Sequence, residues 1–367
     1  MGCVSLEEKL SDAGYSENEV GEAVRAKITE YAGLLSRDAA LKLVARERGI
    51  ETAEETKWVA PEGVAPGSAV DCRIVVERAF RPREFERNNT KRLVADALAD
   101  WGGTKVRLVL WGADANLAGT GALRRGSRLA LKNFLVKQGR DCIELHSREL
   151  CSIEHEGGDY PAPEQLSALA DAEDAVASGV VLANYGAKQS GKGERAVLVF
   201  TDGTASRRLT CWDYNARIAA DLAEGEVVRV EGASARKGEL SAGAGAVLFR
   251  DPACLARFPR VPLNSVGEDE ALVEARIAAL HEARVGPSGT AFVRGSLEDA
   301  SGTARFVAFG ANVFRLLGAR GTRLEPELLL DLKRRYLLGK KAVLACRKRT
   351  DSYGESLVAE AIASVAD

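Results

Sequence analysis

The chain has 367 residues, 46% of them hydrophobic, so length and composition predict two to four domains with packed cores. The net charge of −2 excludes a strong overall attraction to nucleic acid, but it hides a segment of +6 over residues 71–150, between segments of −5 and −7. The seven cysteines are scattered and none forms a CxxC pair, which excludes a disulfide framework and indicates reduced, intracellular thiols. The N-terminus lacks the apolar region of a signal peptide, and no apolar run is long enough to span a membrane.

The first fifty residues show helical patterns. Ser16 with Glu19 three residues later forms a capping-box pattern, which predicts a helix beginning there. Ser36 is expected to cap a second helix. We therefore predict a small helical module at 1–50, followed by an acidic linker rich in proline and glycine at 51–67.

Three segments beyond the linker repeat one pattern. They are DWGGTKVRLVLW (100–111), DGTASRRLTCW (202–212) and DASGTARFVAF (299–309). Each begins with Asp and a turn of small residues, passes through an arginine, and ends as an alternating strand on an aromatic residue. A period of about 100 residues corresponds to a domain rather than to one solenoid repeat. We therefore predict three copies of one small β-domain, at 68–153, 175–251 and 285–367.

The segments between the copies are acidic and contain proline. Residues 154–174 are expected to form a linker, and residues 252–284 a linker that runs into a helix ending near Ala283. Linkers of this kind would bring each later domain to its binding site at a high effective concentration.

The strands of each copy divide their side chains between two faces. In KVRLVLW, the inner face is apolar, whereas the outer face carries Lys105, Arg107 and Trp111. An amphipathic tryptophan covering the edge of a core would explain one such strand, but the arrangement recurs in all three copies. The outer-face residues and their neighbours expected to bind a ligand are Lys105, Arg107, Trp111, Arg128, Lys132, Phe134, Lys137, Arg208, Trp212, Tyr214, Arg305 and Phe309.

A barrel with such a face suits single-stranded nucleic acid, because cations follow the phosphates and aromatic rings stack on unpaired bases. The OB fold is a five-stranded barrel that binds on strands 2 and 3 and on the loops between strands 1–2 and 4–5. The order strand, strand, strand, helix, strand, strand in each copy fits this barrel. We predict a mainly β protein with three tandem OB-fold five-stranded barrels after the helical module.

The stretch RAFRPREFER (78–87) is both basic and aromatic. It is expected to form the loop that leaves strand 1 of the first barrel, with Pro82 preventing regular pairing. Phe80 continues the inward face and is the expected plug of the barrel, whereas Phe85 is expected either to stack on a base or to act as that plug. The arginines expected to reach phosphates are Arg81, Arg83 and Arg87.

Two further hairpins are basic. GAKQSGKG (186–193) resembles a Walker A loop, but glycine replaces the Ser or Thr that would bind Mg²⁺, and a strand follows in place of the phosphate-binding helix. Lys188 and Lys192 are expected either to clamp a nucleic acid or to lie in solvent. The same two alternatives hold for RKRTDSYGE (347–355), with Arg347, Lys348 and Tyr353.

The spacing of Cys142, His146, Cys151 and His155 suggests zinc. On a strand, however, Cys142 and His146 would lie about 13 Å apart, too far for one metal ion. We predict no metal and no cofactor. Because the chain has three histidines and no convincing cluster of nucleophile, base or carboxylates, we also predict no enzymatic activity.

These motifs resemble archaeal replication protein A, the single-stranded DNA-binding protein built from tandem OB folds. RAFRPREFER followed by VADALADWGGTKVRLVLW is similar to its first OB domain, LKNFLVKQGRDCIELH to the last two strands of that domain, and GLLSRDAALKLVARERGI to its N-terminal helical segment. The later copies match less closely, and together the matches cover most of residues 30–367. Many members carry a C-terminal zinc finger with CxxC pairs, which this sequence lacks, so a relative's subunit arrangement is not carried over.

The resemblance implies a cytoplasmic, nucleoid-associated protein that protects single-stranded DNA in replication, recombination and repair, with polymerase, primase or recombinase as partners. Two alternatives remain open. The chain is an RNA-binding OB-fold protein if a 2′-hydroxyl is read, since stacking and phosphate contacts alone do not separate RNA from DNA. It is an interaction scaffold if the third barrel and the helical module bind proteins, through self-association or a second subunit.

Overall fold

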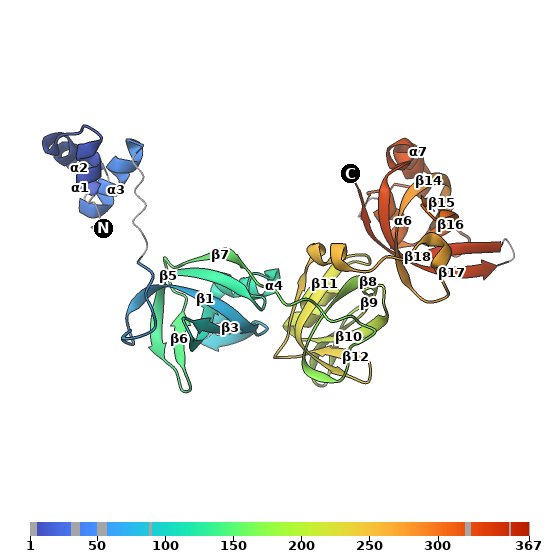
Figure 1. Cartoon of the computed structure of the whole chain (residues 1–367), viewed down its shortest axis with the longest axis horizontal. Coiled ribbons are helices and arrows are strands. Elements are labelled where there is room, and N and C mark those ends of the chain that lie inside the picture. The colour runs from blue at the N-terminus through green and yellow to red at the C-terminus, as the bar shows by residue number, and fades with distance from the viewer. Residues whose placement is uncertain are drawn as a thin grey trace. The chain divides into compact units, whose positions relative to one another are not determined.

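The computed structural model describes residues 6–30, 37–49, 57–87, 90–319, 324–351 and 354–366. The chain divides into two compact units, Met1–Trp58 and Val59–Asp367 (Figure 1). No helix in the described ranges is long and apolar enough to cross a membrane.

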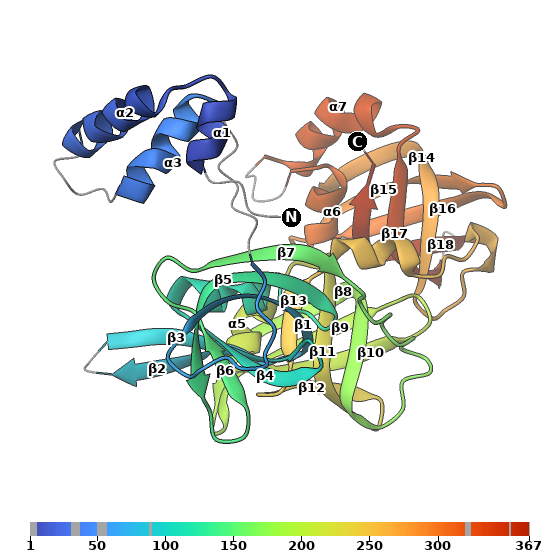
Figure 2. The ribbon, with the colours of Figure 1, turned by 60° about the vertical axis from the view of Figure 1, so that its left-hand side comes forward.

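The first unit is a helical module of α1 (Leu6–Asp12), α2 (Glu17–Glu30) and α3 (Arg37–Glu47), shown in blue in Figure 2. The predicted capping box is confirmed at the start of α2. The Ser16 backbone N–H donates to Glu19 Oε2 at 2.9 Å, and the Glu19 N–H donates to Ser16 Oγ at 3.4 Å. The predicted cap at Ser36 lies outside the described residues. Leucine, valine and alanine side chains from all three helices form the core of this module.

The first barrel follows in the second unit. Its strands are β1 (Ala69–Ala79), β2 (Arg83–Arg87), β3 (Thr90–Trp101), β4 (Thr104–Trp111), β5 (Ser127–Gln138), β6 (Ile143–His146) and β7 (Ser152–Gly158), with η1 (Gly112–Asn116) and α4 (Leu117–Thr120) between β4 and β5. The pairing order is β1-β3-β4-β6-β5, and β5 pairs with β1 to close the ring. The β4–β6 pair is parallel, and the others in the ring are antiparallel. This closed ring of five strands is the barrel that the sequence predicts.

The other two copies repeat this order. The second contains β8 (Ala172–Ser190), β9 (Gly193–Thr201), β10 (Ser206–Trp212), α5 (Tyr214–Ala220), β11 (Val227–Arg236), β12 (Glu239–Ala242) and β13 (Val247–Arg250). The third contains β14 (Ala271–Val285), β15 (Ala291–Asp299), β16 (Gly302–Phe309), α6 (Ala311–Leu316), α7 (Pro326–Leu337), β17 (Lys341–Asp351) and β18 (Gly354–Val365). Strand pairing joins β8-β9-β10-β12-β11 back to β8, and β14-β15-β16-β18-β17 back to β14. Like β4 and β6 of the first barrel, β10 pairs in parallel with β12, and β16 pairs in parallel with β18.

The helix expected to end near Ala283 is wrong. After the short helices η2 (Pro252–Arg257) and η3 (Leu263–Ser265), the chain enters β14, the first strand of the third barrel. The alanine, glutamate and arginine content of this segment favours a helix, but Val273, Ala275 and Ile277 alternate into the barrel core. Pairing with β15 and β17 on both sides overrides the local preference. The predicted linker 154–174 likewise begins inside a strand, because β7 pairs with β5.

Apolar contacts join the three barrels. Val247 and Phe249 of β13 belong to the core cluster of the first barrel. A separate cluster joins the second barrel to the third, with Val180, Val227 and Leu272 among its members. The barrels are therefore packed against one another as well as joined by the chain between them.

Candidate nucleic-acid interface

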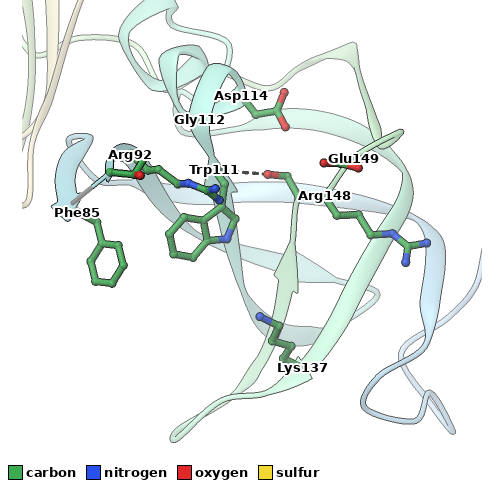
Figure 3. Close-up of a pocket in the computed structure, with 10 residues that line it drawn as sticks. Phe85, Arg92, Trp111, Gly112, Asp114, Lys137, Arg148 and Glu149 are labelled. Atoms are coloured by element: carbon green, nitrogen blue, oxygen red, sulfur yellow. Dashed lines mark hydrogen bonds between the residues drawn. The ribbon is translucent and has the colours of Figure 1, made fainter. Parts of the chain in front are cut away.

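An aromatic groove lies on the outer side of the first barrel, where β2, β3, β4 and β5 contribute side chains (Figure 3). The rings of Phe85 and Trp111 meet edge to face, with centroids 6.1 Å apart and planes at 73°. Phe85 is 44% exposed. Both residues were predicted to bind, and the structure brings them together even though 26 positions separate them in the sequence.

Hydrogen bonds fix the orientation of Trp111. Its indole Nε1–H donates to His146 Nδ1 at 3.1 Å, the two rings stack at 6.2 Å, and the Trp111 backbone N–H donates to Ser147 Oγ at 2.8 Å. His146 Nε2 lies 2.8 Å from Glu144 Oε2, so the tautomer with its proton on Nε2 satisfies both contacts. Burial lowers the pKa of His146, which favours this neutral ring. The groove therefore presents a preorganised aromatic side chain.

Three cations line the same groove as the two rings. Arg92 and Lys137 line the groove and make no ion pair within the part of the chain that the structure describes. Arg148 also lines it, and its Nε–H donates to the Asn133 carbonyl at 2.9 Å. Asp114 and Glu149 add negative charge at the rim. Arg92 and Lys137 are thus the cations best placed to meet a phosphate.

Two arginines predicted to contact phosphates are already paired. The Nη2 atoms of Arg107 and Arg83 lie 2.8 and 3.0 Å from the same Asp96 oxygen. Asp96 is only 6% exposed, and its hydrogen bond raises the pKa of Arg107. A phosphate would have to compete with a largely buried carboxylate for these two side chains.

Several other predicted cations form exposed ion pairs. The pairs are Lys105 with Glu77, Arg128 with Asp159, Arg347 with Glu360, and Lys348 with Glu355. Exposed pairs of this kind contribute roughly 0–1 kcal/mol, so a phosphate can displace them. Lys132 is half-buried on β5, and Arg305 donates to the Glu355 carbonyl at 3.2 Å.

RAFRPREFER is a hairpin arm rather than a loop. β1 ends at Ala79, Pro82 lies outside the strands, and β2 then pairs with β3. Arg81 was expected to reach a phosphate, but it donates to the Trp212 carbonyl at 3.2 Å and pairs with the Asp213 carboxylate, so it contacts the second barrel. The side chain of Arg87 lies outside the described part of the structure.

Two phenylalanines lie on the opposite face from the one predicted. Phe134 is fully buried in the first barrel's core, because Asn133 adopts a left-handed φ of 62° and a β-bulge opposite Asp71 reverses the alternation of β5. Phe80 was expected to plug the barrel, but a bulge between Val76 and Arg78 turns Ala79 inward instead. Phe80 is half-buried in a groove, with the Arg78 guanidinium 5.5 Å from its ring centroid.

The second barrel has a comparable groove. Tyr185, which is 63% exposed, lines it with Lys188, Arg195 and Arg208. The Arg195 guanidinium lies 6.0 Å from the ring centroid of Trp212. Lys188, Lys192 and Arg208 are exposed, and none of them forms an ion pair with another described residue.

The hairpin at 186–193 has the predicted structure, whereas Tyr214 does not lie where it was expected. The 186–193 segment is the predicted hairpin, since β8 ends at Ser190 and β9 begins at Gly193, with no phosphate-binding helix after it. Tyr214 is half-buried rather than open to a ligand. A methyl group built on Gly119 of α4 would lie 2.9 Å from its hydroxyl, so the ring packs against the first barrel. Burial raises the pKa of Tyr214.

The third barrel pairs Phe309 with Phe292, whose ring centroids are 6.5 Å apart. Phe309 is 41% exposed. The guanidiniums of Arg284 and Arg294 lie 5.3 and 5.2 Å from the Phe292 centroid. Each barrel therefore carries an aromatic residue at the end of one strand, Trp111 at the end of β4, Trp212 at the end of β10 and Phe309 at the end of β16. In each barrel, cations lie beside an aromatic ring of this site. Tyr353 lies outside the described residues.

Sequence reasoning missed several of these residues. Arg195 and Phe292 face the strand-ending aromatics Trp212 and Phe309 across the ladder, so the pairing register identifies them. Nothing in the sequence fixes that register in advance. Tyr185 had a signal, since it lies three residues before Lys188 in the same basic hairpin.

The candidate zinc ligands make other contacts. His146 contacts Trp111 and Glu144, and His155 Nε2 lies 3.0 Å from the Tyr160 hydroxyl. Across the described ranges, no three His, Cys, Asp or Glu side chains form a cluster that would hold a metal ion.

No protein-family model and no curated protein matches the chain. Among solved structures, a replication protein A heterotrimer bound to single-stranded DNA is 11% identical, with a TM-score of 0.39, over 84% of this chain and 96% of that one. The second OB-fold domain of replication protein A from Methanococcus maripaludis is 18% identical, with a TM-score of 0.24, over 28% and 98%. The HINa domain of Ifi202 in complex with double-stranded DNA is 11% identical, with a TM-score of 0.25, over 50% and 99%. The OB-fold assignment made here rests on the strand order of the three sheets.

Proposed function

We propose that this chain is a non-enzymatic protein that binds and protects single-stranded DNA. The observation that carries the proposal is the groove of the first barrel, which Phe85 and Trp111 line together with Arg92 and Lys137. Unpaired bases offer their faces to such rings, whereas the bases of a duplex are already stacked on one another. The cations supply phosphate contacts that do not depend on sequence.

The other two barrels support the same function. The second barrel combines exposed Tyr185 with Lys188 and Arg208, and the third combines Phe309 with Phe292 and neighbouring arginines. The barrels differ in the charge available beside their aromatic residues, since Arg284 and Arg294 of the third barrel both pair with Glu282. We therefore expect the first two barrels to contribute more affinity than the third.

The resemblance to archaeal replication protein A supports a role in replication, recombination and repair, in the cytoplasm with the nucleoid. Polymerase, primase and recombinase are the partners that this role implies. No metal or cofactor is required for the binding proposed here.

The test is fluorescence anisotropy of a labelled oligo-dT. Because one OB fold occupies about 4–16 nucleotides, a strand of about 30 nucleotides spans more than one barrel. Trp111→Ala is expected to weaken binding about 5–150-fold, the equivalent of about 1–3 kcal/mol of lost stacking. Val75→Ala is the control, because that side chain is 40% exposed on β1 of the same barrel and does not line the groove.

Salt and competitors complete the test. Lys137→Ala should reduce the slope of log affinity against log salt by about 0.7, the contribution of one phosphate contact on a single strand. If duplex DNA competes as well as the single strand, the preference proposed here is wrong. If matched RNA competes better than DNA, the function is RNA binding. If Trp111→Ala binds like the wild type, the ring covers a protein interface instead.

A further inference from the structure

The third barrel carries an apolar surface on its helix α7. Leu328, Leu332 and Tyr336 follow one another at intervals of four residues along α7, so they form one stripe of the helix. They are 49%, 64% and 53% exposed, and Leu338 next to the helix end is 42% exposed. Contiguous exposed apolar side chains of this kind mark an interaction site.

The buried face of α7 holds the helix on the barrel, whereas the stripe beside it stays exposed. Leu329, Leu330 and Leu337 belong to the core cluster of the third barrel. They anchor the helix against β14 and β15. Arg334 also points to the barrel, where it donates to the His281 carbonyl at 3.2 Å. Leu328 and Leu332, by contrast, leave about half or more of their surface uncovered by this barrel.

The charges of α7 are divided between its two halves. The acidic residues Glu325, Glu327 and Asp331 all precede Leu332, whereas the basic residues Lys333, Arg335 and Lys340 all follow it. Asp331 and Arg335 lie four residues apart on one flank of the stripe. Neither forms an ion pair with another described residue, so both charges remain available at the edge of the apolar surface.

This pattern is complementary to itself when two copies of the helix run antiparallel. We propose that α7 is the interface of a homodimer, with a two-fold axis near Leu332 and with Leu328 of each copy against Tyr336 of the other. In that arrangement Arg335 lies about 3 Å along the axis from Asp331 of the other copy, on the same flank, and the second pair follows by symmetry. A parallel pair would place like charges together. This inference does not depend on the proposed function.

The experiment is sedimentation equilibrium of the full chain over a wide concentration range. The wild type is expected to dimerise, and Leu332→Glu to remain monomeric, because it places two carboxylates at the axis. Leu150→Glu is the matched control, since Leu150 is fully exposed on the first barrel and should leave dimerisation unchanged. A thermal melt of each variant verifies that its fold is retained, as expected for an exposed position.

Charge reversal identifies the orientation of the helices. Asp331→Arg and Arg335→Asp should each weaken dimerisation by about tenfold or more, because like charges then meet across the interface. The double variant should restore it, and a mixture of the two single variants should form a heterodimer. A wild type that stays monomeric overturns the proposal. So does a dimer that survives Leu332→Glu, or a double variant that is not restored, since either places the interface elsewhere.

Discussion

Replacing Arg107 separates a structural role from a binding role. Asp96 is nearly buried, and its Oδ2 accepts one hydrogen bond from Arg107 Nη2 at 2.8 Å and pairs with Arg83 Nη2 at 3.0 Å. Its Oδ1 has no hydrogen-bond partner among the described atoms. Arg107→Ala would leave this carboxylate with Arg83 alone, whose side chain is 60% exposed.

The size of the effect follows from the degree of burial. Breaking a fully buried ion pair costs about 3–5 kcal/mol, and losing one hydrogen bond to a charged group costs about 1.5–3 kcal/mol. Because the Arg107 side chain is 37% exposed and Arg83 keeps its contact, we expect the lower range, about 1.5–3 kcal/mol of unfolding free energy. The affinity for single-stranded DNA should change by less than about 1 kcal/mol, since Asp96 already neutralises this arginine.

Urea denaturation and anisotropy on the same samples measure both quantities. Arg208→Ala is the matched control, because Arg208 is an exposed strand arginine that pairs with no other described residue, so it should lose affinity and keep stability. In a double-mutant cycle, Asp96→Asn should make Arg107→Ala much less destabilising. A variant that unfolds like the wild type but binds DNA tenfold more weakly would refute the reasoning.

Three further predictions concern single positions. Burial holds the pKa of His146 below its ordinary value of 6.5, so the stability it contributes should be complete above that pH and fall as the pH drops below it, an effect that urea midpoints at about pH 7.5 and 5.5 would detect and that His146→Gln should flatten. Burial raises the pKa of Cys211 to about 12, so alkylation of this thiol, followed by mass spectrometry, should be slow until the chain unfolds. Gly121→Ala would place a methyl 2.7 Å from the Phe249 ring at a φ of +81°, and should lower the melting temperature, whereas Gly63→Ala, with similar φ and open space, should cost less.

The alternation of hydrophobic residues predicts the barrels well where strands are regular. Val106, Leu108 and Leu110 are fully buried as expected, and Trp111 lies on the other face. The prediction fails for Phe134 and for Phe80 because one extra residue in a bulge exchanges the two faces. Bulges arise from pairing with a neighbouring strand, which a single strand's sequence does not record.

Ion pairs limited the prediction of the binding site. The sequence identifies Arg107 as an outward cation, but Asp96 reaches it only because β3 and β4 pair in one register. Likewise, Arg81 meets Asp213 through the packing of two barrels, across 132 positions of sequence. Residue type and face predict where cations lie. Which of them remain available for a phosphate depends on tertiary contacts. Lys137, which the sequence predicts, lines the groove without an ion pair to a described residue, whereas Arg92 emerges only from the structure.

Packing between barrels changes how their binding energies combine. Arg315 of the third barrel donates to the Glu224 and Gly225 carbonyls of the second at 2.9 and 2.7 Å, and Phe249 of the second barrel lies in the core of the first. The cost of ordering the barrels is then met during folding and not when a strand binds, which favours affinity. The same packing makes truncation a poor probe of the third barrel. Removing it would expose Val180 and Val227, so an aggregated or unstable remainder would say nothing about DNA or self-association. Point substitutions at exposed positions, such as Leu332 and Phe309, leave these contacts intact and so assign each function to its own surface.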